Sequence, residues 1–451
     1  MVLSAAPIAP LGSHELLMFL LQVGLLLGAA VLLGRLAQRL GMPSVVGELC
    51  AGVVLGPSLL APLAPGFAAW LMPQGPESMH LLDAVGQVGV LLLVGITGMN
   101  VDLGLVRRKG KAAVLVSTGG LVVPFAGGVA VAAVIPAALL AEGSDRTVFA
   151  LFTGVALCVS ALPVIAKTLL DMGLLHRNIG QLIVGASVMD DIAGWLLLSV
   201  VSAMATTGVY GPDIVWTVLS LLAFVLCAWS VGRPLVRRLL RWSARSGGGE
   251  STPALCVVLV VLGSVASHAI HMEAIIGAFL VGLVISNCGE MPRERLAPLR
   301  VIAVSVLAPL FFATAGLRID LTAMARPEVA GSALLVLFVA IAGKYIGAYA
   351  GARAGRLGHW EGLALGAGMN ARGVIEVIIA MVGLRLGILT TEMYTIIVLV
   401  AIVTSVMAPP LLRIAVRRMP VTVEERARER LMAGTPAAEP KTGPPAVESN
   451  S

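Results

Sequence analysis

Five ionisable residues lie within long apolar stretches of this 451-residue sequence. They are Asp190, Asp191, Lys344, Arg372 and Glu376. An ionisable side chain at the centre of a bilayer costs about 2.5–3.5 kcal/mol on insertion scales, so a charge inside a membrane crossing indicates a functional role. Three acids and two bases leave one negative charge without a fixed partner. A proton or a metal cation can balance that charge.

Asp190 and Asp191 are consecutive in the sequence, and consecutive side chains point about 100° apart on a helix. We therefore expect different roles for them: one pairs with Lys344, and the other opens to a water-filled cavity. A carboxyl group in such a place can exchange a proton for a cation, because burial penalises its charged form. The alternative is that all five charges form static buried pairs that hold helices together. The extra acid argues against this alternative.

Two apolar stretches carry residues that break helices. CVSALPVIAK (158–167) places Pro163 in the middle of a crossing, where proline removes a hydrogen bond and clashes with the preceding turn. GAGMNARGVIE (366–376) has several glycines and Asn370 at the equivalent place of a later crossing. A broken helix is tolerated in a membrane only where it lines a cavity or faces protein. A lone proline kink is usually structural, but one that matches a glycine-rich break indicates a binding site.

The ends of such broken helices carry partial charges and favour ionised side chains nearby. Arg372, Glu376 and Lys344 are candidates for this role. The hydroxyl of Ser160, beside the first break, can add an oxygen ligand suited to a hard monovalent cation.

The elements that position these residues are membrane helices, as the composition indicates. The chain is 58% hydrophobic and 12% charged, against about 45–50% and 25% in soluble domains. Stretches of about 20 apolar residues, enough for one crossing, recur over nearly its whole length. The many Leu, Val, Ala and Gly residues suit packed helices and exclude an outer-membrane barrel. The fold class is therefore all-α and polytopic, and the five cysteines, which form no CxxC pair, predict neither disulfides nor a zinc site.

The basic residues are concentrated in short loops, so the net charge of +6 reflects membrane topology rather than a nucleic-acid partner. Eighteen lysines and arginines fall in or beside odd-numbered loops and four in even-numbered loops. By the positive-inside rule the N-terminus is outside and the C-terminus is cytoplasmic. We predict thirteen crossings, near residues 15–38, 44–61, 79–100, 112–135, 147–170, 178–205, 212–241, 252–268, 273–288, 299–317, 328–352, 360–384 and 392–416.

The two halves of the chain can be aligned with each other. Crossings two, three and five match crossings nine, ten and twelve, always seven apart. Because seven is odd, the repeats have opposite membrane orientations, an architecture of secondary transporters with a site near mid-membrane. Glycine-rich helices resemble one another by chance, but three matches in the same order argue against chance. The matches are 45–54 with 274–284, 97–103 with 315–321, and 160–173 with 370–383.

Longer stretches carry a resemblance to a known family. They resemble the monovalent cation:proton antiporter-2 family, which is sodium/proton exchanger-like, and are most similar to its plant cation/proton exchanger branch. The resemblance covers roughly residues 15–416. It rests on PSVVGELCAGVVLGPSLL (43–60), on PLFFATAGLRIDL (309–321), on the run from ALCVSALP to SVMDDIAGW (156–195) and on the run from GKYIGAYAG to GLRLGIL (343–389).

This resemblance implies about thirteen transmembrane helices in two inverted six-helix repeats, with two broken crossing helices. It also implies a homodimer, and a core that moves the ion past a fixed scaffold. The implied segments are 1–105 (scaffold and dimerisation helices one to three), 106–206 (core helices four to six), 207–250 (linker helix seven), 251–322 (scaffold helices eight to ten), 323–418 (core helices eleven to thirteen) and 419–451, which its composition predicts to be a disordered cytoplasmic tail.

The same resemblance assigns roles to the charged residues. Asp191 matches the aspartate that binds the monovalent metal cation and the proton, Asp190 matches its acidic neighbour, and Lys344 matches the lysine that pairs with it. Ser160 matches a hydroxyl residue at the first break. Polar positions at the second break are matched by Asn370, Arg372 and Glu376.

Two positions depart from the family pattern: Asn100 stands where many relatives carry Glu, and Cys158 where some carry a hydroxyl. Both departures bear on ion preference. The potassium-efflux branch carries a nucleotide-binding regulatory domain, which we do not expect in this chain.

We therefore predict a secondary active transporter, not an enzyme, that exchanges Na+ or K+ for H+ across the cytoplasmic membrane by alternating access. We expect no organic cofactor and no nucleic-acid partner. One alternative is a cation-conducting channel or an organic-anion/sodium symporter on a similar inverted-repeat fold, although a channel would lack the mid-membrane acid. Another is a membrane sensor, which would carry a sizeable soluble domain.

Overall fold

The computed structural model describes residues 12–71, 76–101, 103–207, 212–245, 251–270, 272–288 and 296–426, which are almost entirely α-helical. The helices are α1 (Ser13–Arg39), α2 (Ser44–Leu55), α3 (Leu60–Leu63), α4 (Pro65–Leu71), α5 (Pro76–Asn100), α6 (Leu103–Val134), α7 (Arg146–Cys158), α8 (Leu162–Asp171), α9 (Asn178–Thr207), α10 (Pro212–Cys227), α11 (Arg233–Arg245), α12 (Ser251–Ala269), α13 (Ala274–Ser286), α14 (Ala297–Ile302), α15 (Ala308–Gly316), α16 (Pro327–Ala354), α17 (His359–Met369), α18 (Val374–Arg385) and α19 (Thr391–Val416).

The described helices make this a multi-pass membrane protein. Ten spans are long and apolar enough to cross a bilayer, and α17 with α18, which meet at a bend of 46°, would make an eleventh. The helices α7 and α13 are apolar but have only 13 residues each, fewer than the roughly 20 of a full crossing. The predicted all-α class is confirmed, whereas the count of thirteen crossings stays a prediction.

Side-chain caps mark where several helices begin. Asp145 accepts hydrogen bonds from the backbone N–H groups of Thr147 and Val148 at the start of α7. Thr390 does the same for Met393 at the start of α19. Such caps satisfy backbone donors that have no partner within the helix. The caps therefore determine the residue at which each of these apolar helices begins.

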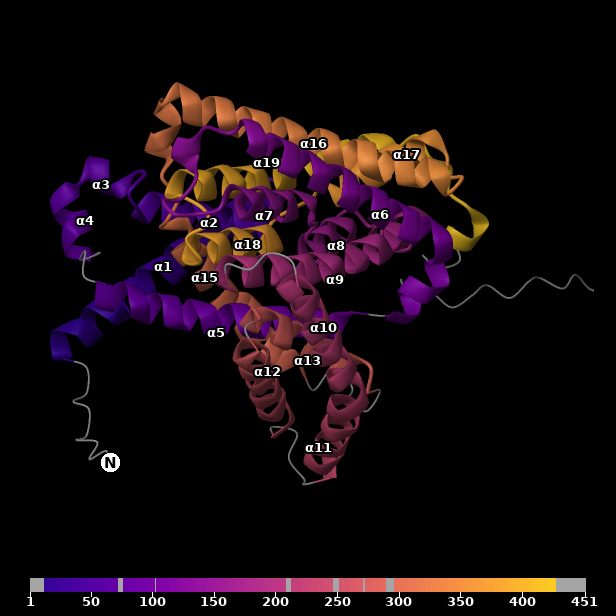
Figure 1. Ribbon diagram of the computed structural model, residues 1–451, viewed down its shortest axis with the longest axis horizontal. Coiled ribbons are helices and arrows are strands. Elements are labelled where there is room, and N and C mark those ends of the chain that lie inside the picture. Colours follow the sequence, from indigo (N-terminus) through magenta and orange to yellow (C-terminus); the bar gives the residue numbers. More distant parts are fainter. Residues whose placement is uncertain are drawn as a thin grey trace, which may run out of the picture.

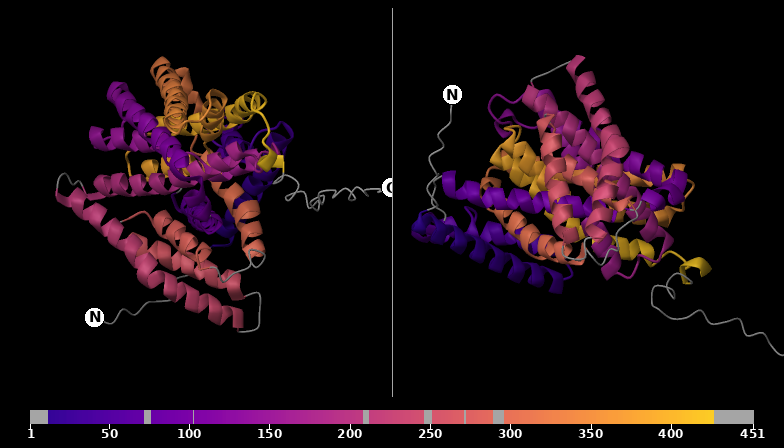
Figure 2. Two further views of the ribbon diagram at one scale, coloured as in Figure 1. Left: turned by 90° about the vertical axis from the view of Figure 1, so that its right-hand side faces the viewer. Right: turned by 90° about the horizontal axis from the view of Figure 1, so that it is seen from below.

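The helices pack in two groups that mix both halves of the sequence. The long helices α6 and α16 lie side by side along one edge of the molecule, at the top of Figure 1. The helices α10, α11 and α12 project from the opposite edge (Figure 2). Between these edges lie α7, α8, α9 and α18, of which α9 carries the buried Asp190 and Asp191 and α18 the buried Glu376.

Close glycine contacts repeat between the two halves. A Cβ at Gly52 in α2 would overlap the carbonyl oxygen of Ala313 in α15, so only glycine permits this approach. At the position matched to Gly52, a Cβ at Gly282 in α13 would overlap the carbonyl oxygen of Gly95 in α5. The matched residues therefore make matched contacts, as the alignment of the halves predicts. Small residues allow such close backbone approach between membrane helices.

The chain that follows α19 folds back onto the loop between α8 and α9. The buried Arg177 guanidinium donates to the Pro420 carbonyl at 3.1 Å and lies 3.1 Å from a Glu425 carboxylate oxygen. The Asn178 backbone N–H donates to the same carboxylate at 2.7 Å. The prediction of disorder from residue 419 is therefore wrong as far as residue 426, because one buried ion pair holds this segment. Residues 427–451 lie outside the described residues.

Candidate functional site

Two broken helices meet in the middle of the molecule. The chain leaves helical geometry at residues 159–161, between α7 and α8, and again at 370–373, between α17 and α18. The Ala161 backbone N–H donates to the Ala371 carbonyl oxygen at 3.2 Å, which joins the two breaks directly. The sequence predicted both breaks, and the structure brings them into contact.

The first break precedes the proline rather than centring on it. Pro163 is the second residue of α8, a position where its missing N–H would have no helical partner. The expectation that Pro163 itself interrupts the crossing is corrected in this respect. At the second break Gly373 has a φ of 151°, which side-chain-bearing residues rarely adopt, and a Cβ there would lie 2.9 Å from Val164.

Two buried cations satisfy the carbonyl end of α7. The Arg372 guanidinium donates to the Leu157 carbonyl oxygen at 2.5 Å and to the Ala156 carbonyl oxygen at 3.3 Å. The Lys344 ammonium donates to the Cys158 carbonyl oxygen at 2.6 Å. A helix C-terminus carries a partial negative charge and carbonyls without helical partners. Both side chains are therefore placed where the broken helix needs positive charge.

Asp190 lies at the centre of a fully satisfied polar cluster. Lys344 Nζ is 2.7 Å from Asp190 Oδ2, and neither side chain is exposed. The Ser117 hydroxyl donates to Asp190 Oδ1 at 2.7 Å. The Ser160 hydroxyl lies 2.9 Å from both Asp190 Oδ2 and the Met369 carbonyl oxygen, and its single proton can serve one of them at a time. Of the two acids, the structure pairs Asp190 with the lysine.

Arg372 and Glu376 form the second buried pair. Arg372 Nη1 lies 3.2 Å from Glu376 Oε1, one helical turn away, and both side chains are buried. Glu376 is in the first turn of α18, where the helix N-terminus favours a negative charge. The Arg372 carbonyl oxygen accepts a hydrogen bond from the Ser405 hydroxyl of α19. This pair therefore joins the second break, which contains Arg372, to the first turn of α18, which contains Glu376.

Asp191 is the acid that remains without a partner. Its side chain is 0% exposed, and no described residue hydrogen-bonds to either carboxylate oxygen. The amide of Asn370, at the second break, is equally buried, and neither its oxygen nor its nitrogen has a hydrogen-bond partner within the described ranges. The structure thus places the unbalanced negative charge at Asp191, about 100° around α9 from Asp190.

Two cavities are lined in part by the helices that follow the two breaks, α8 and α18. One of about 580 Å3 is lined by Pro43 between α1 and α2, by Val164 and Thr168 of α8, and by Arg413 of α19. Val164 also borders the second break, where a Cβ at Gly373 would lie 2.9 Å from it, so this cavity adjoins the site. No group of three or more His, Cys, Asp or Glu side chains in the described part of the chain could hold a metal ion.

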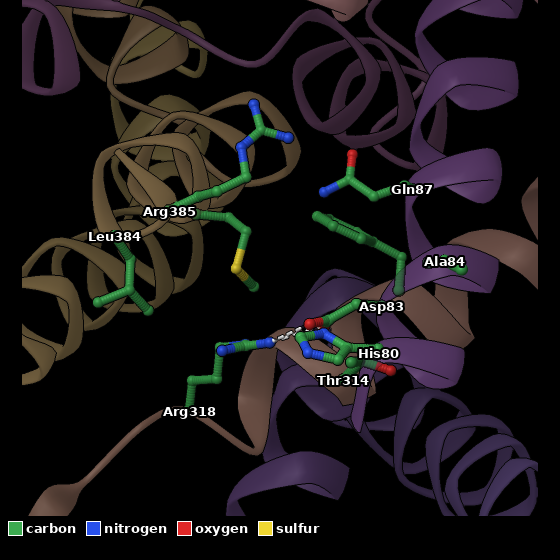
Figure 3. A pocket seen from close by; sticks show the side chains of 11 residues that line it. His80, Asp83, Ala84, Gln87, Thr314, Arg318, Leu384 and Arg385 are labelled. Carbon is green, nitrogen blue, oxygen red and sulfur yellow. Dashed lines mark hydrogen bonds and ion pairs between the residues drawn. The ribbon is translucent and has the colours of Figure 1, made fainter. Parts of the chain in front are cut away.

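The other cavity, of about 310 Å3, lies between α5, α15 and α18 (Figure 3). Arg318 of the segment after α15 reaches across it to Asp83 of α5, with 2.6 Å between the charged atoms. Arg385, at the end of α18, lines the same cavity and forms an ion pair with Glu273 at 2.5 Å. Glu273 immediately precedes α13, so this pair joins α18 to α13.

The sequence does not predict one neighbour of Asp190. Ser117 donates to Asp190, yet it lies on α6, 73 residues away, as one of several small polar residues in an apolar helix. Nothing in its local pattern distinguishes it. Only the packing of α6 against α9 reveals its contact.

Known proteins match almost the whole chain. The pattern of the family described as sodium/hydrogen exchanger, transmembrane, matches residues 26–418. The Na(+)/H(+) antiporter NhaS4 of Synechocystis sp. is 31% identical over 88% of this chain and 97% of its own length. The Na(+)/H(+)-K(+) antiporter GerN of Bacillus cereus is 30% identical over 88% of this chain and 95% of its own length. Cation/H(+) antiporter 20 of Arabidopsis thaliana is 32% identical over 87% of this chain, which matches 48% of that protein.

A solved structure has the same fold. The sodium proton antiporter MjNhaP1 of Methanocaldococcus jannaschii matches with a TM-score of 0.69 over 90% of this chain and 99% of that chain, at 15% sequence identity. The predicted resemblance is confirmed by the extent of the family match and by relatives that align along nearly their whole length. The chain belongs to the sodium/hydrogen exchanger family.

Proposed function

We propose that this protein is a secondary active transporter that exchanges Na+ or K+ for H+ across the cytoplasmic membrane by alternating access. The observation that carries the proposal is Asp191, a fully buried carboxyl that lacks a partner among the described residues, beside charges that are paired. The names of NhaS4, a Na(+)/H(+) antiporter, and of GerN, a Na(+)/H(+)-K(+) antiporter, support the same exchange.

In this mechanism Asp191 binds either one cation or one proton. An ionised carboxyl that is buried without a partner is strongly unfavourable. A proton or a bound cation neutralises Asp191 and removes this penalty, whereas the empty, ionised form retains it. Only the loaded forms therefore change their exposure between the two sides of the membrane, and binding of one ion requires release of the other.

The other site residues support Asp191. The Asp190 and Lys344 pair closes one side of the site, and Ser160 contributes a hydroxyl between Asp190 and the Met369 carbonyl. At the second break the supporting residues are Asn370, whose amide can ligate the cation, Arg372 and Glu376, while Pro163 starts α8 at the first break. No organic cofactor takes part.

The site residues fall in two of the proposed segments, 106–206 and 323–418, which form the moving core. Residues 1–105 and 251–322 form the scaffold and the homodimer interface, and 207–250 links the halves. The distribution of Lys and Arg supports an external N-terminus and a cytoplasmic C-terminus.

The test is exchange by the purified protein in proteoliposomes that contain a pH-sensitive dye. Addition of Na+ or K+ is expected to drive proton movement, and the series Na+, K+ and Li+ identifies the preferred ion. Asp191→Asn should abolish this flux, because an amide can neither release a proton nor neutralise a cation. Asp320→Asn is the matched control, since Asp320 caps a short helix and Asn caps equally well. Near-normal flux in Asp191→Asn would place the site elsewhere.

A further inference from the structure

A second set of buried polar side chains continues along α9 beyond the ion site. Trp195, Ser199 and Ser202 follow Asp191 at spacings of four, four and three residues. On a helix these four side chains lie within about 80° of one another. None is more than 3% exposed. Among the described residues, the indole N–H and the two hydroxyls find no hydrogen-bond partner.

The two serines differ from the other buried hydroxyls of the membrane helices. A serine or threonine in a helix commonly donates to the carbonyl oxygen one turn back. Of the serine and threonine hydroxyls fully buried in the described ranges, only those of Ser199 and Ser202 have no partner at all. Buried hydroxyls that donate one turn back include those of Thr153, Ser187, Ser264, Thr314, Thr395 and Thr404.

This polar face of α9, made of Trp195, Ser199 and Ser202, lies on the side of α13. The ring of Trp195 is 6.4 Å from the ring of Phe279 in α13. Asp190 instead faces α6 and α16 through its contacts with Ser117 and Lys344. The polar face is therefore turned toward the proposed scaffold and away from the interior of the core.

A purely structural role does not account for these groups. A buried polar group left without a hydrogen bond pays its full desolvation penalty with no compensating interaction. Small serines permit close helix packing, but alanine permits it as well and leaves no unpartnered hydroxyl. Two such hydroxyls and an indole N–H on the same face as an unpartnered carboxyl point to a shared polar occupant.

We propose that Trp195, Ser199 and Ser202 line the route by which a hydrated monovalent cation passes between Asp191 and the outer surface. Serine oxygens can ligate the cation, and the indole N–H, which is only a donor, holds a water of its hydration shell. The inner side of the site is served by the cavity at Val164 and Thr168. This inference rests on the proposed exchange and on the topology that places the Thr207 end of α9 outside.

The test is the apparent KM for the cation, measured from each side in right-side-out and inverted membrane vesicles. The double variant Ser199→Ala, Ser202→Ala is expected to raise the outer KM about threefold to tenfold, because the cation loses two oxygen ligands on its route; at about 1.4 kcal/mol per tenfold this is about 0.7–1.4 kcal/mol. The inner KM and the turnover at saturating cation should stay unchanged. Ser264→Ala, a buried serine that donates to its own helix, is the matched control.

A second measurement does not depend on KM. Ser202→Cys, in a background whose five native cysteines are alanine and which still exchanges, should react with a membrane-impermeant thiol reagent from outside, and the transported cation should slow the reaction. An unchanged outer KM together with an unreactive Cys at position 202 would overturn the route while leaving the exchange function standing. Absence of exchange in the unmodified protein would overturn both.

Discussion

Replacement of Lys344 by methionine is expected to lower the free energy of unfolding by about 3–5 kcal/mol, because a buried ion pair that loses one partner leaves an uncompensated charge. Lys344 donates to the Gly120 carbonyl at 2.8 Å, to the Cys158 carbonyl at 2.6 Å and to Asp190 at 2.7 Å. After the substitution Asp190 keeps only two serine hydroxyls as donors. Of the five charged residues of the site, three acids and one base would then remain.

A second substitution separates the pair from its surroundings. Asp190→Asn in the Lys344→Met background removes the orphaned charge, and replacing both members of a buried pair by neutral residues is often neutral or stabilising. The double variant should therefore recover most of the lost stability. The coupling energy between the two positions is expected to be about 3 kcal/mol, the upper end of the range for residues in contact.

The assay is thermal unfolding of the purified variants in detergent, with exchange measured on the same preparations. Lys111→Met is the control, because Lys111 is exposed and surface changes usually stay within about 0.5 kcal/mol. Additive effects of the two substitutions would refute the reasoning. A stable Lys344→Met variant with an altered pH dependence of exchange would instead show that Lys344 changes partners during the transport cycle.

Three further predictions test other parts of the structure. Gly373→Ala should destabilise the protein by about 1–3 kcal/mol in thermal unfolding, because φ near 151° strains any residue with a side chain; an unchanged unfolding temperature would contradict this. Arg385→Gln should change unfolding by less than about 1 kcal/mol, since Arg385 is half-exposed beside Glu273, and a larger loss would show that this pair locks α18 to α13. Burial alone would raise the pKa of Glu425, but backbone N–H donors and Arg177 outweigh it and hold the pKa below its ordinary value. Docking of the C-terminal segment should therefore persist above the unfolded pKa of about 4.3 and be lost as the pH falls through the lowered pKa of folded Glu425. Limited proteolysis at decreasing pH measures this loss. The Glu425→Gln variant is the control, because it lacks this pH dependence.

The sequence predicts those features of the site that depend on local patterns. Glycines and a proline mark both broken helices, and the surplus of one acid follows from counting charges in apolar stretches. The 100° angle between Asp190 and Asp191 predicts that they have different surroundings. From the residues alone, however, either aspartate could pair with the lysine, because the rotation of α9 about its axis depends on all the helices packed against it.

Contacts between distant segments are the part that the sequence could not predict. Ser117 and the carbonyl groups at the end of α7 look like ordinary parts of apolar helices, yet they complete the cluster around Lys344 and Arg372. The docking of Glu425 on Arg177 joins residues 248 positions apart in a segment whose composition favours disorder. Each of these contacts depends on tertiary packing rather than on helix propensity or hydrophobic pattern.

In the proposed mechanism, the two faces of α9 allow one helix both to hold the site together and to bind the ion. On the face of Asp190 every oxygen and every N–H of the lysine partner is bonded, so this face resists change. On the face of Asp191, Trp195 and the two serines the polar atoms lack partners among the described residues, so a ligand there gains interactions without breaking existing ones. Because adjacent residues occupy these faces, a one-residue insertion before Asp190 would rotate the following side chains by about 100° and remove both Asp190 and Asp191 from their present surroundings. Cation/proton exchange should therefore tolerate substitutions that change side-chain size on α9 far better than any change of its register.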